Sequence, residues 1–287
     1  MGSEAIAPAL SKFLFGKKPN ELSQEQKDTI TSILNLTTAI TAYSTTGGSV
    51  ADAVNGAEIG RVGVENNRTA SEVLFALQNP IIASRIGVVA SDKDLHKIQN
   101  PNISTIVATF QVNLINKNAQ NLDGVTGEGG IANAYRHALW QTIISNEFGS
   151  KIATQVGNVH EASYTDQHVN SPTYGGLYLD QVFYSSRANA DEVVDQFNNQ
   201  VGRNIYAKSP GLQNKDYAKL VLDHYYNNGL YQVLKSGDSY HIEVVRLPQE
   251  IYNKAVQSIA SLDNTGAGPS LQKRRLQYRQ NSIMGSR

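Results

Sequence analysis

Apolar residues recur at helical spacing along most of the chain, and this pattern predicts a mainly α-helical protein. Residues 20–43 begin with Ser23 and Gln26 at the spacing of a capping box and continue with isoleucine and leucine on one helical face. An Ala- and Gly-rich helix is expected after the break at 44–49, which would complete a helical hairpin. Further helices are predicted over 103–119, over 131–148, from Ser150, over 188–206 and up to about Gly229.

A β pattern stands out at one place only. The segments YQVLK (231–235) and YHIEVV (240–245) alternate in polarity, and SGDS between them supplies turn residues. We therefore expect a small β-hairpin within an otherwise helical domain. Just before it lie Tyr217, His224, Tyr225 and Tyr226, which could line a pocket, but we favour the core for them.

The helix over 131–148 has an apolar side and a polar-aromatic side. Asn133, His137 and Gln141 recur every four residues on the polar side, with Trp140, the only tryptophan, beside them. A lone histidine on such a helix is often a satisfied core residue. The alternative is that this side forms one wall of an active site.

The helix over 188–206 carries two stripes, and Asn189 or Asp191 is expected to cap it. The stripe predicted to be buried is Val194, Phe197, Val201 and Ile205. The second stripe is Asp195, Asn198, Asn199 and Gly202, with Arg203 at its edge. Adjacent asparagines are poor helix formers, so either solvent or a polar interior must offset their cost.

Composition sets limits on the chemistry. Hydrophobic residues make up 40% and charged residues 17% of the 287 residues, which allows a buried core. The absence of cysteine excludes disulfides, thiolate metal sites and a cysteine nucleophile. No run of 18 or more apolar residues occurs, so we expect no stable transmembrane span.

The N-terminal pattern LSQEQKDTI…TTGGSVADAVNGAEIGRVGVENN, ending in Val64–Asn67, resembles the pre-toxin VENN segment of CdiA-type contact-dependent growth inhibition proteins. The resemblance covers roughly residues 5–67, and VENNRT here departs from the VENNYL usual in that family. It implies a toxin region after Asn67, carried on a larger secreted or cell-surface protein of the producer. It also implies delivery into neighbouring bacteria and a cognate immunity protein.

The expected domain limits follow from this resemblance. Residues 1–67 form the pre-toxin segment, and 68–100 form a linker or a reduced module for entering the target cell. Residues 101–287 form the toxin domain, with a basic tail from about residue 264 that is most simply solvated.

Three blocks in the toxin region, RHAxW, HE and DxxNNxxGR, resemble a family of bacterial effector domains over roughly residues 100–210. This second resemblance implies no particular reaction. The candidate catalytic residues are His137, His160, Glu161 and Asp195. The candidate substrate-binding residues are Arg136, Trp140, Asn198, Asn199 and Arg203.

Histidines paired with carboxylates suit acid–base or nucleophilic chemistry near neutral pH. No metal and no cofactor is expected. A zinc site of His137, His160 and Asp195 is the rival interpretation, although HExxH spacing is absent after Glu161.

Charge guides the choice of substrate. Residues 124–263 carry ten basic and fourteen acidic side chains, a net of −4, which suits a nuclease poorly. We therefore expect a hydrolase or transferase acting on phospholipid, or on another small phosphate-bearing substrate of the target cell. The alternatives are a toxic RNase or DNase, which the basic tail would favour, and a non-enzymatic membrane-disrupting toxin in which His137 is dispensable.

Overall fold

The structure is a computed structural model that describes residues 3–31, 33–34, 70–120, 127–160 and 183–284. The chain divides into two compact units, Met1–Val89 and Ala90–Arg287, and each is described by itself. The expectation of a mainly α protein with one small antiparallel hairpin is confirmed. None of the helices in the described part of the chain combines the length and apolar character needed to cross a membrane.

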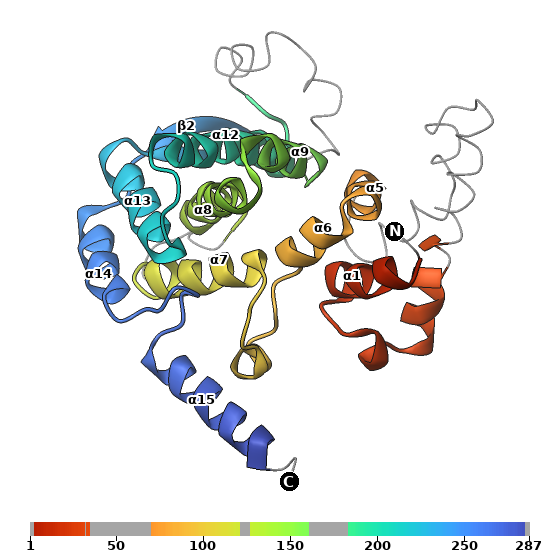
Figure 1. Cartoon of the computed structure of the whole chain (residues 1–287). Coiled ribbons are helices and arrows are strands. Elements are labelled where there is room, and N and C mark those ends of the chain that lie inside the picture. The colour runs from red at the N-terminus through yellow and green to blue at the C-terminus, as the bar shows by residue number, and fades with distance from the viewer. Residues whose placement is uncertain (1–2, 32, 35–69, 121–126, 161–182, 285–287) are drawn as a thin grey trace, which may run out of the picture. The chain divides into compact units, whose positions relative to one another are not determined.

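The first unit is a small helical cluster (Figure 1). Its elements are α1 (Ser3–Phe15), the short η1 (Pro19–Glu21), a helical stretch at 24–31, α5 (Ala70–Gln78) and α6 (Pro80–Ile86). Leu10, Ile33 and Val73 are fully buried in its core. The predicted capping box is present: Ser23 N–H donates to Gln26 Oε1 at 3.1 Å, and Gln26 N–H donates to Ser23 Oγ at 3.3 Å.

The second helix of the expected pre-toxin hairpin and the VENN tetrapeptide lie outside the described residues. Within the expected linker at 68–100, α5 and α6 are helical and pack in the first unit. The border between the two units falls between Val89 and Ala90.

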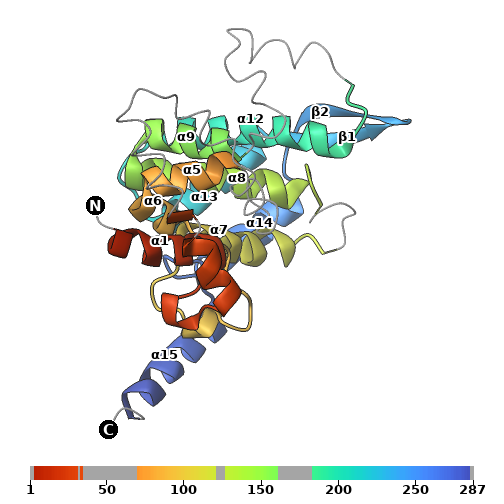
Figure 2. The same ribbon diagram turned by 90° about the vertical axis from the view of Figure 1, so that its right-hand side faces the viewer.

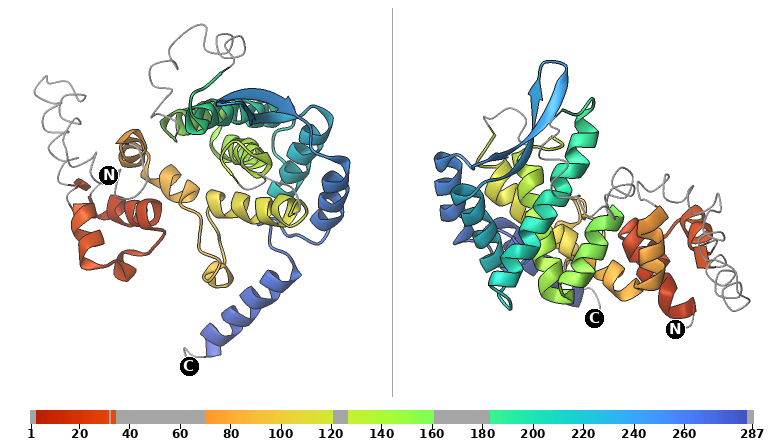
Figure 3. Two further views of the ribbon diagram at one scale, coloured as in Figure 1. Left: turned by 180° about the vertical axis from the view of Figure 1, so that it is seen from behind. Right: turned by 90° about the horizontal axis from the view of Figure 1, so that it is seen from above.

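The second unit surrounds one central helix. Its helical elements are η2 (Leu95–Lys97), α7 (Ile103–Gln111), η3 (Val112–Asn116), α8 (Ile131–Phe148), α9 (Ser150–His160), α12 (Arg187–Lys208), α13 (Asn214–Asn227), α14 (Gln249–Ile259) and α15 (Pro269–Met284). Figure 1, and the view from behind in Figure 3, show α8 enclosed by α7, α9, α12 and α13. Tyr135, Leu139 and Ile143 of α8 have no exposed surface, so this helix is the core of the unit.

Helices α8 and α12 pack so closely at Gly202 that their backbones are in direct contact. A Cβ atom placed on Gly202 would lie 2.1 Å from the carbonyl oxygen of Ala138, so only glycine fits there. Thr142 Oγ1 donates to the Gly202 carbonyl at 3.0 Å and joins the two helices at the same point. Gly149, with φ of 85°, ends α8 as the sequence predicts.

The polar stripe of α12 is buried, contrary to the simpler expectation for charged and amide side chains. Asp195, Asn198 and Asn199 are 5%, 0% and 0% exposed, whereas Phe197 and Val201 of the apolar stripe are only half-buried. A polar interior therefore offsets the cost of the two asparagines. The predicted cap was wrong: Ser186 is the N-cap, and its Oγ accepts from Asn189 N–H at 3.2 Å.

The hairpin packs on α12. Strands β1 (Leu230–Ser236) and β2 (Ser239–Val245) pair antiparallel around a turn in which Gly237 has φ of 59°. Figure 2 shows the hairpin alongside the end of α12. Tyr217 and Tyr225 of α13 are fully buried, which confirms the core placement favoured for them, whereas His224 and Tyr226 are only half-buried.

Most side chains of the C-terminal residues are exposed, as expected for a solvated tail, but these residues also make specific contacts with the unit. They form α15, whose Arg275 is 7% exposed and donates from Nε to the Leu95 carbonyl of η2 at 3.1 Å. Arg279 Nη2 donates to Gln99 Oε1 at 2.6 Å. The guanidinium groups of these two arginines thus hold α15 against the rest of the unit through hydrogen bonds. A count of charges along the sequence does not predict these contacts.

Candidate functional site

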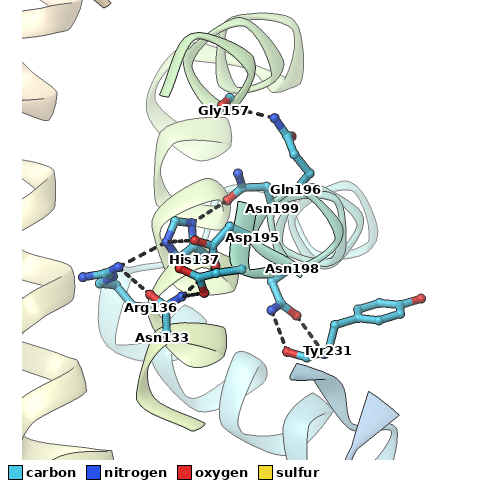
Figure 4. A network of polar contacts seen from close by, with 10 residues as sticks. Asn133, Arg136, His137, Gly157, Asp195, Gln196, Asn198, Asn199 and Tyr231 are labelled. Carbon is cyan, nitrogen blue, oxygen red and sulfur yellow. Dashed lines mark hydrogen bonds and ion pairs between the residues drawn. The ribbon is translucent and has the colours of Figure 1, made fainter. Parts of the chain in front are cut away.

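His137, on α8, lies at the centre of a buried polar network (Figure 4). His137 is only 3% exposed to solvent. Its Nδ1 atom lies 3.3 Å from Asn199 Oδ1, and its Nε2 atom lies 3.2 Å from Asp195 Oδ2. An amide oxygen faces Nδ1, and the Arg136 guanidinium, which can only donate, lies 3.3 Å from Nε2; we therefore assign the ring proton to Nδ1, which leaves Nε2 as the basic nitrogen.

The surroundings of His137 keep the ring neutral. Burial lowers its pKa well below the ordinary histidine value, and the positive charges of Arg136 and His160 lower it further. The hydrogen bond with Asn199 acts in the opposite direction. The short contact with Asp195 alone would suggest an ion pair, but we favour the neutral ring, because burial is the largest effect and the nearby Arg136 guanidinium already supplies positive charge.

Asn133, one turn before His137, connects both carboxylates of the network to the arginine. Its Nδ2 donates to Asp191 Oδ1 at 2.9 Å and to Asp195 Oδ1 at 2.8 Å. Its Oδ1 accepts from Arg136, whose Nη2 also lies 3.3 Å from His137 Nε2. A single amide therefore fixes the positions of two acids and one cation around the histidine.

Asp191 is a member of this network that sequence analysis missed as a site residue. It is half-buried, and burial together with the charge of Glu128 raises the pKa of its carboxyl to about 6. A hydrogen bond from the Gly129 backbone, the charge of Arg136 and the bond from Asn133 act against that rise. The usable signal was its spacing, one helical turn before Asp195.

His160 and Trp140 extend the site towards solvent. The ring centroids of His137 and His160 are 6.1 Å apart, and those of Trp140 and His160 are 5.3 Å apart. His160 and Arg136 are exposed and Trp140 is half-buried, so these side chains form the outer edge of the site. Glu161 lies outside the described residues.

Two of the predicted substrate-binding residues make other contacts. Asn198 Nδ2 donates to the Tyr231 carbonyl at 2.9 Å, and its Oδ1 accepts from Tyr231 N–H at 3.0 Å, so the amide is used to hold β1 on α12. Arg203 is 8% exposed and donates to Gln141 Oε1 and to Gln200 Oε1, each at 2.9 Å.

Helix α9 closes over the network because Gly157 has no side chain. A Cβ atom there would lie 3.0 Å from Gln141 Nε2 and 3.2 Å from Asn199 Nδ2. The amide that orients His137 is thus packed directly against the α9 backbone. Within the described ranges, no group of three or more His, Asp or Glu side chains is placed to hold a metal ion.

Comparison with known families identifies two segments. Residues 19–68 match the pre-toxin domain with VENN motif, which supports a polymorphic toxin C-terminal region. Residues 97–229 match a domain of unknown function (DUF6973), a range that contains α8, α9 and α12 and therefore the whole site. No curated protein and no solved structure matches the chain.

The pre-toxin match fits the toxin region of a larger secreted or cell-surface protein used in bacterial competition. The CdiA family itself and the three-block effector family stay predictions.

Proposed function

We propose that the second unit is the toxic part of this polymorphic toxin, and that it is an acid–base enzyme centred on His137. Its substrate is a small phosphate-bearing molecule, in the first place a phospholipid head group. A cognate immunity protein protects the producer, and the reaction takes place in the target cell.

The observation that carries this proposal is the state of the His137 ring. Asn199 orients Nδ1, the surroundings keep the ring neutral, and Nε2 points to Asp195 and Arg136. A neutral, oriented imidazole is the form required of a general base. Asp195 stabilises the imidazolium that forms when Nε2 takes a proton.

The exposed edge supports a small anionic substrate. Arg136 presents a guanidinium to solvent beside the base, and one guanidinium binds one phosphate or carboxylate group by paired hydrogen bonds. Trp140 and His160 provide an apolar and aromatic wall next to it. Burial is the main cause of the raised pKa of Asp191, and the negative charge of Glu128 adds to it; acidic side chains beside the site oppose the binding of a polyanion.

In the proposed reaction, His137 Nε2 removes a proton from a water molecule that attacks the ester. Arg136 stabilises the negative charge that develops on the phosphate oxygens. The residues of the chain supply this chemistry without a cofactor.

A toxic nuclease is the second candidate, and the basic face of α15 favours it. Lys273 and Arg274 of that helix are exposed. Contacts at several phosphates are needed to hold a nucleic-acid backbone, and α15 is where the described residues would offer them.

To test this proposal, the full chain is expressed in a bacterium from a tightly repressed promoter. One version carries an added export signal and one does not, so that both the cell envelope and the cytoplasm of the host are exposed to the toxin. We expect growth arrest and a changed lipid or metabolite profile, while RNA and chromosome stay intact on gels. His160→Gln and Arg136→Gln, both at exposed positions, are expected to prevent arrest without changing the thermal melt. His137→Gln is expected to prevent it as well.

His224→Gln, a half-buried histidine on α13, is the matched control and should remain toxic. If wild type promptly cleaves nucleic acid and His160→Gln does not, the substrate is nucleic acid rather than lipid, and the nuclease alternative is correct. Toxicity that survives all three site variants would refute the enzyme and favour membrane disruption.

A further inference from the structure

The structure contains a second acid, Asp191, whose role is not explained by orienting His137. It lies on α12 one turn before Asp195, and both carboxylates accept from the same Asn133 nitrogen, at 2.9 and 2.8 Å. Asp195 lies 3.2 Å from Nε2 of His137, whereas Asp191 is connected to the network through its hydrogen bond from Asn133. The network therefore has a histidine at one end and a half-buried carboxyl at the other.

We propose that Asp191 is the general acid of the reaction in which His137 is the general base, so that the substrate is an ester whose leaving oxygen needs a proton. This proposal rests on the proposed function, since it assigns a partner to the same base.

The surroundings of Asp191 and of His137 shift the pKa values of the two side chains in opposite directions. The charged groups that face Asp191 are Glu128 from the segment before α8, Arg136 from α8 and Asp195 on its own helix. Burial and Glu128 raise the pKa of Asp191 to about 6, while burial lowers the pKa of His137. The two shifts have opposite signs, and each favours the form that the proposal requires, a carboxyl that holds its proton and a neutral imidazole.

The packing also fixes the position of the Asp191 carboxyl. Gly129 lies against it, because a Cβ atom on that glycine would be 3.4 Å from Asp191 Oδ1, and the Gly129 backbone hydrogen-bonds to the carboxyl. Arg187 Nε donates to the Glu128 carbonyl at 2.7 Å, which keeps this segment beside α12. Asn133 donates to Oδ1 of this carboxyl, and in the proposed step Oδ2 carries the proton to the leaving group.

The proton balance of the step is closed. His137 Nε2 takes one proton from the attacking water, and the water oxygen bonds to the phosphorus or acyl carbon. The bond to the leaving oxygen breaks, its electron pair stays on that oxygen, and Asp191 supplies the proton. Because Asp191 is half-buried, solvent returns a proton to it. The proton on His137 leaves to the water molecule that takes the place of the departed product.

The test compares Asp191→Asn, which keeps the shape but cannot donate a proton, with Asp191→Glu, which keeps the acid. Loss of a general acid slows a reaction by roughly 10²–10⁴-fold. We therefore expect growth arrest to be lost in Asp191→Asn and partly kept in Asp191→Glu. Asp216→Asn, an exposed aspartate on α13, is the matched control and should remain toxic.

A second measurement does not depend on toxicity. In the purified full chain, ¹³C NMR of the carboxyl carbons should show one aspartate titrating near pH 6, and that signal should be missing in Asp191→Asn. Glu128→Gln should shift the same signal to lower pH, because Glu128 contributes to the raised pKa.

The outcomes separate the two proposals. If His137→Gln abolishes toxicity but Asp191→Asn does not, Asp191 is not the acid and the proposed function stands. Equal loss of toxicity in Asp191→Asn and Asp191→Glu, with neither variant melting below wild type, would also overturn the assignment, as would titration of Asp191 near the ordinary 3.8. Toxicity that survives in the His137, His160 and Arg136 variants removes the proposed function, and this inference with it.

Discussion

The contact between α8 and α12 predicts that replacing Gly202 by alanine destabilises the protein, whereas the same change inside an ordinary helix stabilises it. Gly202 lies inside a long helix, where replacing glycine by alanine normally stabilises a protein by about 0.5–1 kcal/mol. In this structure a Cβ atom on Gly202 would lie 2.1 Å from the Ala138 carbonyl oxygen. The obstacle is backbone, so the two helices must move apart to admit a methyl group.

The expected cost follows from two losses. Overpacking a well-packed core typically costs about 1–3 kcal/mol, and a backbone obstacle favours the upper end. Separating the helices also weakens the hydrogen bond from Thr142 to the Gly202 carbonyl, which contributes about 1 kcal/mol. We expect Gly202→Ala to lower the free energy of unfolding by about 3 kcal/mol, or Tm by about 6–12 °C for a unit of this size.

Thermal and urea unfolding of the full chain, followed by circular dichroism, measure this effect. Asn204→Ala on the exposed side of the same helix is the control and should stay within about 0.5 kcal/mol of wild type. A Tm for Gly202→Ala equal to or above that of wild type would refute the close approach of the two helices.

Three further changes test other contacts. Asn198→Ala removes both bonds to the Tyr231 backbone and should cost about 2 kcal/mol in urea unfolding, with faster amide exchange in β1; unchanged exchange there would contradict the amide's structural role. Arg275→Met should release α15 at a cost of roughly 2 kcal/mol, seen as faster hydrogen exchange in that helix but not in α8. The raised pKa of Asp191 means that the folded state binds its proton more tightly than the unfolded state does, so its contribution to stability falls as pH rises from about 4 to 6. Asp191→Asn should therefore raise the free energy of unfolding at pH 8 by up to roughly 2 kcal/mol, with a matching rise in Tm, and should leave Tm unchanged near pH 3. Equal shifts of Tm at both pH values would contradict the raised pKa.

Much of the local structure could be predicted because it depends on neighbouring residues. The Ser23–Gln26 capping box, the limits of α8 and the β-hairpin all follow from residues a few positions apart. Spacing at helical intervals also placed His137, Asn133 and Gln141 on one side of α8. In each case the interaction that decides the structure lies within one or two turns of chain.

The sequence did not determine which polar side chains would meet a substrate and which would hold the fold. Asn198 and Asn199 are adjacent and chemically identical, yet one binds the Tyr231 backbone and the other orients His137. A step of one residue turns a side chain by about 100° around a helix, and only the packed neighbours decide what it then meets. The same reason hid Asp191, which becomes a candidate acid because Asn133, Glu128 and Gly129 come from a different part of the chain.

The basic C-terminal residues give the broadest contrast. Their charge and polarity are properties of the sequence, and by themselves they favour a solvated tail. The structure makes them a helix, because Arg275 and Arg279 find acceptors on Leu95 and Gln99 about 180 residues earlier. The sequence by itself determined that this protein is a cysteine-free chain able to bury a core, from its composition, and that it is mainly helical, from the spacing of its apolar residues. Pairing between distant residues, which carries no local signature, was decided only when the tertiary structure brought them together.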